Sequence, residues 1–187
     1  MQTESGSGKT ARRGAQQLHV IETRVAEGEL AERLAGKITP LAKLVSGIPS
    51  VPAIERSELY LKPYYFSTCL QKKRFGISNF EEAEIQVSVD ALTGVASVYE
   101  HQPHWDGVRR QDLPAGTTLI EPQLTADDAA DKTLRKATHL QVRHKCEVRI
   151  VSEPFLVYKP IWLVTVLGRK GSKRYAVDAF TGYVLQE

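Results

Sequence analysis

Two groups of histidine, cysteine and aspartate are the side chains whose types and spacing could do chemistry in this chain. The groups are His101, His104 and Asp106, and His139, His144 and Cys146. Imidazole, thiolate and carboxylate are the usual ligands of zinc and related ions. Neither group has the spacing of a known structural zinc site, so we expect solvated histidines in a loop and at a helix end. We therefore predict no metal and no cofactor.

Catalysis and nucleotide binding find little support in the residues. An enzyme would need His101, His104 and Asp106 to meet in a cleft, and the sequence singles out no arrangement of serine, histidine and aspartate. Segment 6–10, GSGKT, ends like a phosphate loop. The earlier glycine of that loop would fall at Thr3, and no strand can precede it. We predict that the protein is not an enzyme and has no catalytic residues.

Basic side chains gather in two short segments, 71–74 and 169–174, which we expect at two hairpins. Together they could bind nucleic acid or another anionic ligand as a bipartite cationic surface. The alternative is that the hairpins are solvated and that lysine keeps sheet edges from pairing with other chains. The candidate residues of this surface are Lys72, Lys73, Arg74, Arg169, Lys170, Lys173 and Arg174.

An internal duplication defines the elements that must position these residues. Segment 59–70, LYLKPYYFSTCL, returns as 156–167, LVYKPIWLVTVL, and segment 89–94, VDALTG, returns as 177–182, VDAFTG. Units of this size bury little surface alone, so we expect the two copies to pack together or to pair sheet edges. The predicted organisation is a disordered tail over 1–16, a first repeat over 17–100, a connection over 101–123 and a second repeat over 124–187.

Each copy is predicted to be a helix followed by strands. Apolar residues at helical spacing predict a helical segment, interrupted at Gly36 and Thr39-Pro40 before a short second helix that ends at Gly47: Leu30, Leu34, Ile38, Leu41 and Val45. Segment 125–128, TADD, has the spacing of a helix N-terminal cap. Ile85, Val87 and Val89 alternate with polar residues, as in a half-buried strand. The predicted fold class is α+β, with each helix packed on an antiparallel sheet.

The repeated aspartates have a structural interpretation. Asp90 and Asp178 each begin a turn in which the carboxylate accepts backbone amides and a following glycine adopts a left-handed conformation. We therefore predict that both are turn-forming residues and do no chemistry.

The repeated Lys-Pro-aromatic segment is less ordinary. Proline cannot donate to a strand ladder, which predicts a strand edge or bulge at Pro63 and Pro160. Such an edge would suit the addition of a peptide strand. Most aromatic residues that follow are expected in the core, because large apolar groups are usually buried. Tyr65 and Trp162 are the aromatic candidates for a partner-binding surface.

The C-terminal copy carries three consecutive motifs. They are Thr-x-Asp-Asp-Ala-Ala at a helix start, Pro-x-Trp-Leu-Val-x-Val in a strand, and Tyr-x-Val-Asp-Ala-x-Thr-Gly-x-Val-Leu after a hairpin. In these motifs residues 124–187 resemble a PepSY-type domain, and residues 17–100 resemble it less closely. The resemblance implies a cystatin-like α+β fold and a non-catalytic role in which a partner is bound or inhibited.

Composition sets broad limits on partners and location. A formal charge of +3 over 187 residues permits contact with nucleic acid or anionic lipid without demanding it. Cys69 and Cys146, one in each half, are most simply small core residues; a disulfide between them stays open for an exported protein. The chain has no apolar run typical of a signal peptide or membrane span, so we expect a soluble cytoplasmic protein, exported only if its N-terminus is trimmed.

The sequence as a whole predicts a non-enzymatic module that binds a protein or peptide, with a regulatory or inhibitory role as one form of that function. Binding of nucleic acid or another anionic ligand through segments 71–74 and 169–174 is the alternative. A homodimer stays open.

Overall fold

The computed structural model describes residues 17–37, 51–75, 79–99, 105–109, 112–168 and 171–185, so the predicted tail over 1–16 lies outside them. Within these ranges the chain forms a ten-stranded, mostly antiparallel sheet with two α-helices and one 3-10 helix. The predicted α+β class with an antiparallel sheet is confirmed. The helical elements are η1 Glu27–Glu29, α1 Leu30–Lys37 and α3 Ala126–His144. The strands are β1 Gln17–Ile21, β2 Ala53–Phe75, β3 Asn79–Asp90, β4 Ala96–Tyr99, β5 Trp105–Arg109, β6 Thr118–Leu119, β7 Glu147–Ile150, β8 Phe155–Gly168, β9 Gly171–Asp178 and β10 Val184–Leu185.

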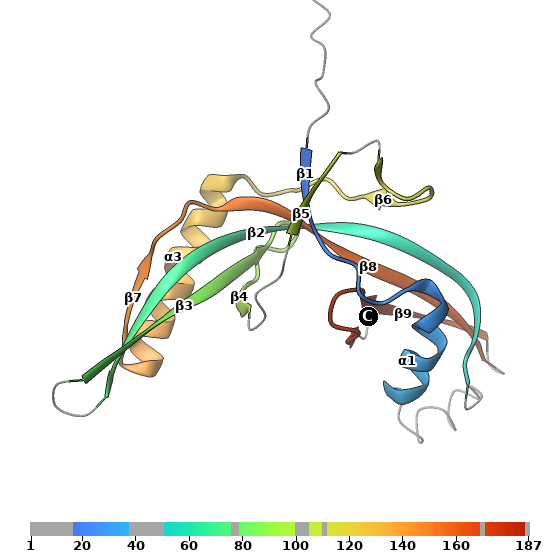
Figure 1. Cartoon of the computed structure of the whole chain (residues 1–187), viewed down its shortest axis with the longest axis horizontal. Coiled ribbons are helices and arrows are strands. Elements are labelled where there is room, and N and C mark those ends of the chain that lie inside the picture. Colours follow the sequence, from blue (N-terminus) through green and yellow to red (C-terminus); the bar gives the residue numbers. More distant parts are fainter. Residues whose placement is uncertain are drawn as a thin grey trace, which may run out of the picture.

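Two long strands, β2 and β8, form the centre of the sheet. They pair antiparallel, with Lys62 directly opposite Lys159. β3 and β4 extend the sheet beyond β2, and β9 and β10 extend it beyond β8, in the order β10-β9-β8-β2-β3-β4. β5 and β6, which lie in the predicted connection over 101–123, also join this sheet through β1 and β2. In Figure 1 the long strands arch over the molecule and carry the β2–β3 and β8–β9 hairpins to opposite ends.

Each helix packs on strands from the other half of the chain. α1 precedes β2 in sequence, yet its Leu30 and Leu34 pack with Val164 of β8. α3 precedes β8, and its Leu140 packs with Cys69 of β2 and with residues of β3 and β7. The two helices therefore lie at opposite ends of the arch (Figure 1). Helical periodicity shows which face of a helix is apolar but not which strands cover it, so the sequence did not predict this exchange.

Local signals at α3 and the cysteines behave as the sequence indicates. The Thr125 side chain accepts the amide of Asp128, whose carboxylate accepts the amide of Thr125, so the predicted helix cap is confirmed. Cys69 and Cys146 are free and buried in the core beneath α3, which confirms their assignment to the core. Gln71 Nε2 also donates to Cys146 Sγ at 3.1 Å.

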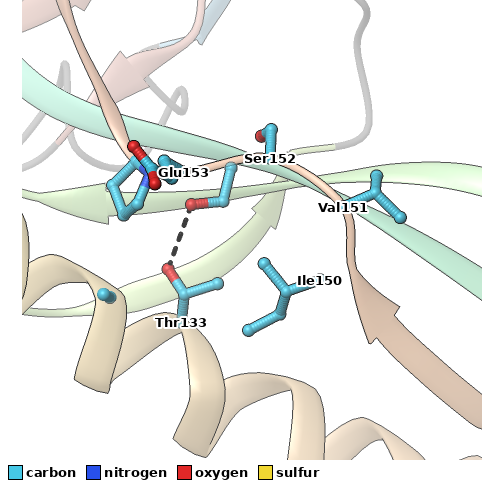
Figure 2. Close-up of a pocket in the computed structure, with 8 residues that line it drawn as sticks. Thr133, Ile150, Val151, Ser152 and Glu153 are labelled. Carbon is cyan, nitrogen blue, oxygen red and sulfur yellow. Dashed lines mark hydrogen bonds between the residues drawn. The ribbon is translucent and has the colours of Figure 1, made fainter.

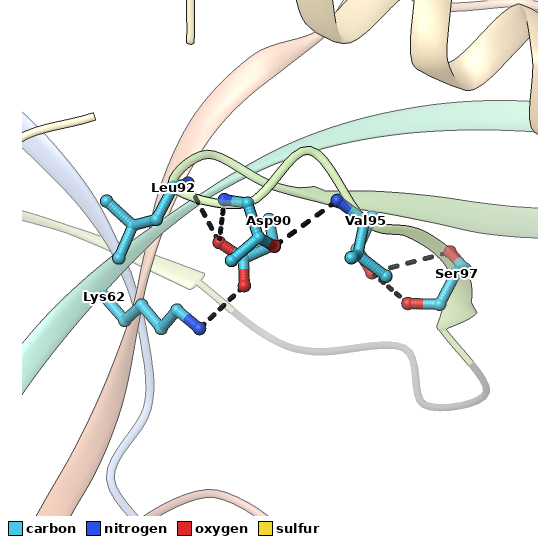
Figure 3. A network of polar contacts seen from close by, with 7 residues as sticks. Lys62, Asp90, Leu92, Val95 and Ser97 are labelled. Atoms are coloured by element: carbon cyan, nitrogen blue, oxygen red, sulfur yellow. Dashed lines mark hydrogen bonds and ion pairs between the residues drawn. The ribbon is translucent and has the colours of Figure 1, made fainter. Parts of the chain in front are cut away.

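The turns after β3 and β9 have matching contacts. Asp90 Oδ1 accepts the amides two and three residues ahead at 2.9 and 3.3 Å (Figure 3), and Asp178 Oδ1 accepts the corresponding amides at 2.9 and 3.2 Å. The second oxygen of each carboxylate bonds a lysine of a central strand, Lys62 to Asp90 at 2.7 Å and Lys159 to Asp178 at 2.6 Å. The glycine of each turn has a left-handed φ, 72° and 74°. The turn-forming role predicted for the aspartates is confirmed, and each turn is also fixed to the centre of the sheet.

Neighbouring strands flank Pro63 and Pro160, so the prediction of exposed edges is wrong, whereas both prolines do lie at corresponding irregular positions of the sheet. β2 has β8 on one side and, on the other, β6 up to Leu61 and β3 from Tyr64 onward. Pro63 lies between these two neighbours, where a missing N–H removes no ladder bond. Pro160 has the corresponding position on β8. Tyr158 before it pairs with β1, and the pairing with β9 begins at Ile161.

We predict that Asp178→Asn lowers the free energy of unfolding at neutral pH by about 3 kcal/mol, because it leaves the Lys159 ammonium without its buried partner. Burial raises the pKa of Asp178, but the Lys159 ion pair and the hydrogen bonds from Thr181 and Phe180 lower it by more. The pKa therefore lies below its ordinary value. A depressed folded-state pKa stabilises the fold above the unfolded value, about 3.9, and this contribution disappears as pH falls through the folded value. Urea unfolding at several pH values measures both effects.

Asp90→Asn is the matched control. The Lys62–Asp90 side chains are 28% and 12% exposed, against 13% and 5% for Lys159–Asp178, so we expect a smaller loss from Asp90→Asn. Equal losses, or an Asp178→Asn protein with the acid dependence of the wild type, would contradict this assignment.

Candidate functional site

Tyr65 and Trp162, the aromatic candidates, are both used inside the protein. Tyr65 Oη donates to the carbonyl of Leu124 at 3.2 Å, and Trp162 Nε1 donates to the carbonyl of Val25 at 2.9 Å. Each acceptor lies just before a helical segment, so the two bonds fix corresponding helix entries to the central strands. Tyr65 is buried and Trp162 half-buried, which fits positions in the core better than the predicted partner-binding surface.

We predict that Trp162→Phe lowers the free energy of unfolding by about 1–2 kcal/mol, since it removes the bond and leaves the Val25 carbonyl without this donor. Tyr65→Phe removes the matching bond to Leu124 and should have an effect of the same sign. Both variants should bind any partner with unchanged affinity when measured well below their melting temperatures. An unchanged stability, or a selective loss of binding, would return these side chains to the list of binding residues.

The first basic hairpin is of mixed charge. Lys73 lies opposite Glu81 and Lys72 opposite Glu82 in the β2–β3 ladder, and Lys72 Nζ lies 3.4 Å from Glu82 Oε1. Arg74 is in β2, but its side chain is not among those described. Because glutamates of β3 face the lysines of β2, this hairpin does not present a uniformly cationic surface.

The second basic hairpin lies at the other end of the arch (Figure 1). Lys173 and Arg174 are exposed on β9, whereas residues 169–170 lie outside the described residues. Glutamates accompany this hairpin too: Ser172 Oγ donates to Glu55 at 2.7 Å. The structure therefore separates the two hairpins, and binding of an anionic ligand stays a prediction.

The first group of candidate metal ligands lies mostly outside the described residues, and the second group is divided between the surface and the core. Residues 101–104 lie outside the described ranges, and nothing is described of the Asp106 side chain. In the second group His139 and His144 are exposed on α3, while Cys146 is buried beneath it. In the described part of the chain, no three histidine, cysteine or acidic residues meet in a group that could hold a metal ion.

The outer edge of β3 is a feature that the sequence analysis missed. β4 pairs only with residues 86–89 of β3, so in the described structure residues 79–85 pair with β2 alone. Glu81, Glu82 and Glu84 are exposed along this free segment. Three glutamates within residues 81–84, just before the strand predicted at Ile85–Val89, were the available signal, because charged residues are typical of strands at sheet edges.

A pocket beneath α3 is the second missed feature. It has a volume of about 320 Å³ and lies between the helix and the break that separates β7 from β8. Ser67 of β2 and Thr133 of α3 line it, with their hydroxyl oxygens 3.5 Å apart. Thr133, Ile150, Ser152 and Glu153 lie around it in Figure 2. No motif marks this site, since its residues come from β2, α3 and the segment before β8.

Comparisons with models of protein families, with curated proteins and with solved structures find no match for this chain. Among the described residues, no helix is both long and apolar enough to cross a membrane.

Proposed function

We propose that the protein is a non-enzymatic binding module that accepts an extended polypeptide segment as an added strand on the outer edge of β3. The observation that carries this proposal is the mismatch between β3, which has 12 residues, and β4, which has four. A strand that extends beyond its neighbour offers backbone donors and acceptors in a row, and added strands bind to such rows in many peptide-binding domains.

The direction of the backbone groups supports strand addition. The Asp90 amide donates outward to the carbonyl of Val95 at 3.0 Å, across the side of β3 that faces β4. The β2–β3 ladder has no register shift from Asp90 to Asn79, and N–H groups alternate in direction along a strand. Glu84 and Glu82 therefore direct their N–H and C=O groups outward, where an added strand would bond them.

The side chains of the edge define the partner's chemistry. Glu82 and Glu84 lie on one face of the sheet and Glu81 on the other, because side chains alternate along a strand. An added strand places its own side chains beside these carboxylates, and opposite charges across a strand pair are favourable. The proposed partner is an extended segment that carries lysine or arginine and has few acidic residues. Binding such a segment requires no catalytic step, which is consistent with a regulatory or inhibitory role.

We also propose that the chain is a tandem of two PepSY-like units. The matching aspartate turns support this organisation, as do the matching bonds of Tyr65 and Trp162 to the helix entries. The two units would then share a framework and differ in the charge of the outer edge: β3 carries glutamates beyond β4, whereas β9 carries Lys173 and Arg174 beyond β10.

A labelled peptide of alternating lysine and valine tests the binding proposal by fluorescence anisotropy. We expect saturable binding that weakens as salt is added, and little binding of a peptide in which glutamate replaces lysine. Glu84→Pro should weaken binding about tenfold, since it removes an outward N–H and the charge of one carboxylate. Glu84→Gln is the matched control: it removes the same charge, keeps the N–H and should weaken binding less.

Equal affinity of the Pro and Gln variants would sink the proposal of strand addition, because backbone bonding would then make no difference. Far-ultraviolet circular dichroism checks that Glu84→Pro remains folded. If it does not, Glu82→Pro, one outward position nearer the hairpin end, serves the same purpose. Failure of both peptides to bind the wild-type protein would also contradict the proposal.

A further inference from the structure

The pocket beneath α3 exists because one end of the molecule has small polar residues where the other end has large apolar ones. The matching bonds of the two aromatic side chains align the ends. Ser67 follows Tyr65 by two positions, as Val164 follows Trp162. Thr133 follows the acceptor Leu124 by nine positions, as Leu34 follows the acceptor Val25. Val164 and Leu34 are fully buried and pack in the same core cluster. Ser67 and Thr133 instead line the pocket of about 320 Å³.

One of the two hydroxyl groups of this pocket has an O–H donor without an acceptor. Ser67 is 0% and Thr133 1% exposed, so solvent has little access to either side chain. Their mutual contact of 3.5 Å, drawn in Figure 2, uses one of the two O–H donors at most. Among the described residues neither hydroxyl has another hydrogen-bond partner. A buried donor without an acceptor destabilises the protein, which favours a molecule that brings the acceptor.

We propose that this pocket is a binding site for a small, mostly apolar, uncharged molecule that carries one hydrogen-bond acceptor such as a carbonyl. Its volume lies at the lower end of the range of ligand pockets, and its apolar lining comes from Ala130, Ile150, Val151 and Pro154. The acceptor of the ligand meets the spare O–H of the Ser67–Thr133 pair after the side chains around the pocket move apart, because both hydroxyls are buried. The apolar body occupies the space that larger side chains fill at the other end of the molecule.

The rim of the pocket restricts the ligand further. Ser152 is held in place, because its hydroxyl accepts the amide of Thr68 at 2.7 Å and the amide of Val151 donates to the Thr68 carbonyl at 2.9 Å. Glu153 is exposed at the same rim, and its carboxylate repels anions. The site therefore favours a neutral carbonyl compound over a carboxylic acid, which is ionised at neutral pH.

Acetophenone and α-methylstyrene form a matched pair of probes, since a CH₂ group in the second replaces the carbonyl oxygen of the first. Amide chemical shifts of the full chain, followed during each titration, report binding at Ser67, Thr133 and Ser152. We expect saturable shifts with acetophenone and an affinity at least about fivefold weaker for α-methylstyrene, which offers no acceptor.

The variant Ser67→Ala/Thr133→Val removes both hydroxyls and adds no bulk to the pocket, since valine has the shape of threonine and alanine lacks only the serine oxygen. It should lose the preference for acetophenone and should be about as stable as the wild type, because it removes two poorly bonded buried hydroxyls. Thr133→Ser keeps a hydroxyl at this position and should keep the preference; it serves as the second variant if the double variant does not fold.

Three results would overturn the site. They are an absence of saturable shifts with acetophenone, equal binding of both probes to the wild-type protein, and a preference that survives in the double variant. None of them bears on peptide binding at β3, which uses the opposite side of β2 and can be measured separately in the same variants.

Discussion

The two ion pairs at the centre of the sheet are the constraint on which the rest of the structure depends. Lys62 and Lys159 lie directly opposite each other in the antiparallel pair of β2 and β8, and like charges in that position repel. Each ammonium is neutralised by the aspartate that also holds the adjacent turn. The ion pairs thereby couple the pairing of β2 with β8 to the two turns and to β4 and β10, the strands that follow the turns. A change at one aspartate therefore affects the strand pairing on both sides of it.

The two ends of the molecule use this common frame differently. At one end Leu34 and Val164 fill the core, and the part of β9 that extends past β10 carries Lys173 and Arg174. At the other end Thr133 and Ser67 leave a pocket, and β3 extends well past its outer neighbour. Both features that we connect with binding lie at this second end.

The sequence predicts what depends on neighbouring residues and misses what depends on the assembly of distant ones. The aspartate turns and the Thr125 cap were predictable, because a side chain and the amides it accepts lie within three residues. The exchange of the helices was not, since helical periodicity contains no information about which strands cover an apolar face. Tyr65 illustrates the same limit: its bond to Leu124 spans 59 residues, and nothing local distinguishes such an aromatic residue from one at a surface. The prediction of exposed edges beside the prolines was wrong, because a proline removes no ladder bond where its strand changes from one neighbouring strand to the next.

Residue-resolved hydrogen exchange of β3 tests the free edge most directly, because it needs no ligand. The outward amides of Glu82 and Glu84 should exchange rapidly, whereas the inward amides of Glu81, Ala83 and Ile85, bonded to β2, should be protected. An alternating pattern of this kind is the result that the structure predicts. Uniform protection would mean that another segment covers the edge, and uniform rapid exchange would mean that the hairpin is not formed; either result would contradict a free edge available for strand addition.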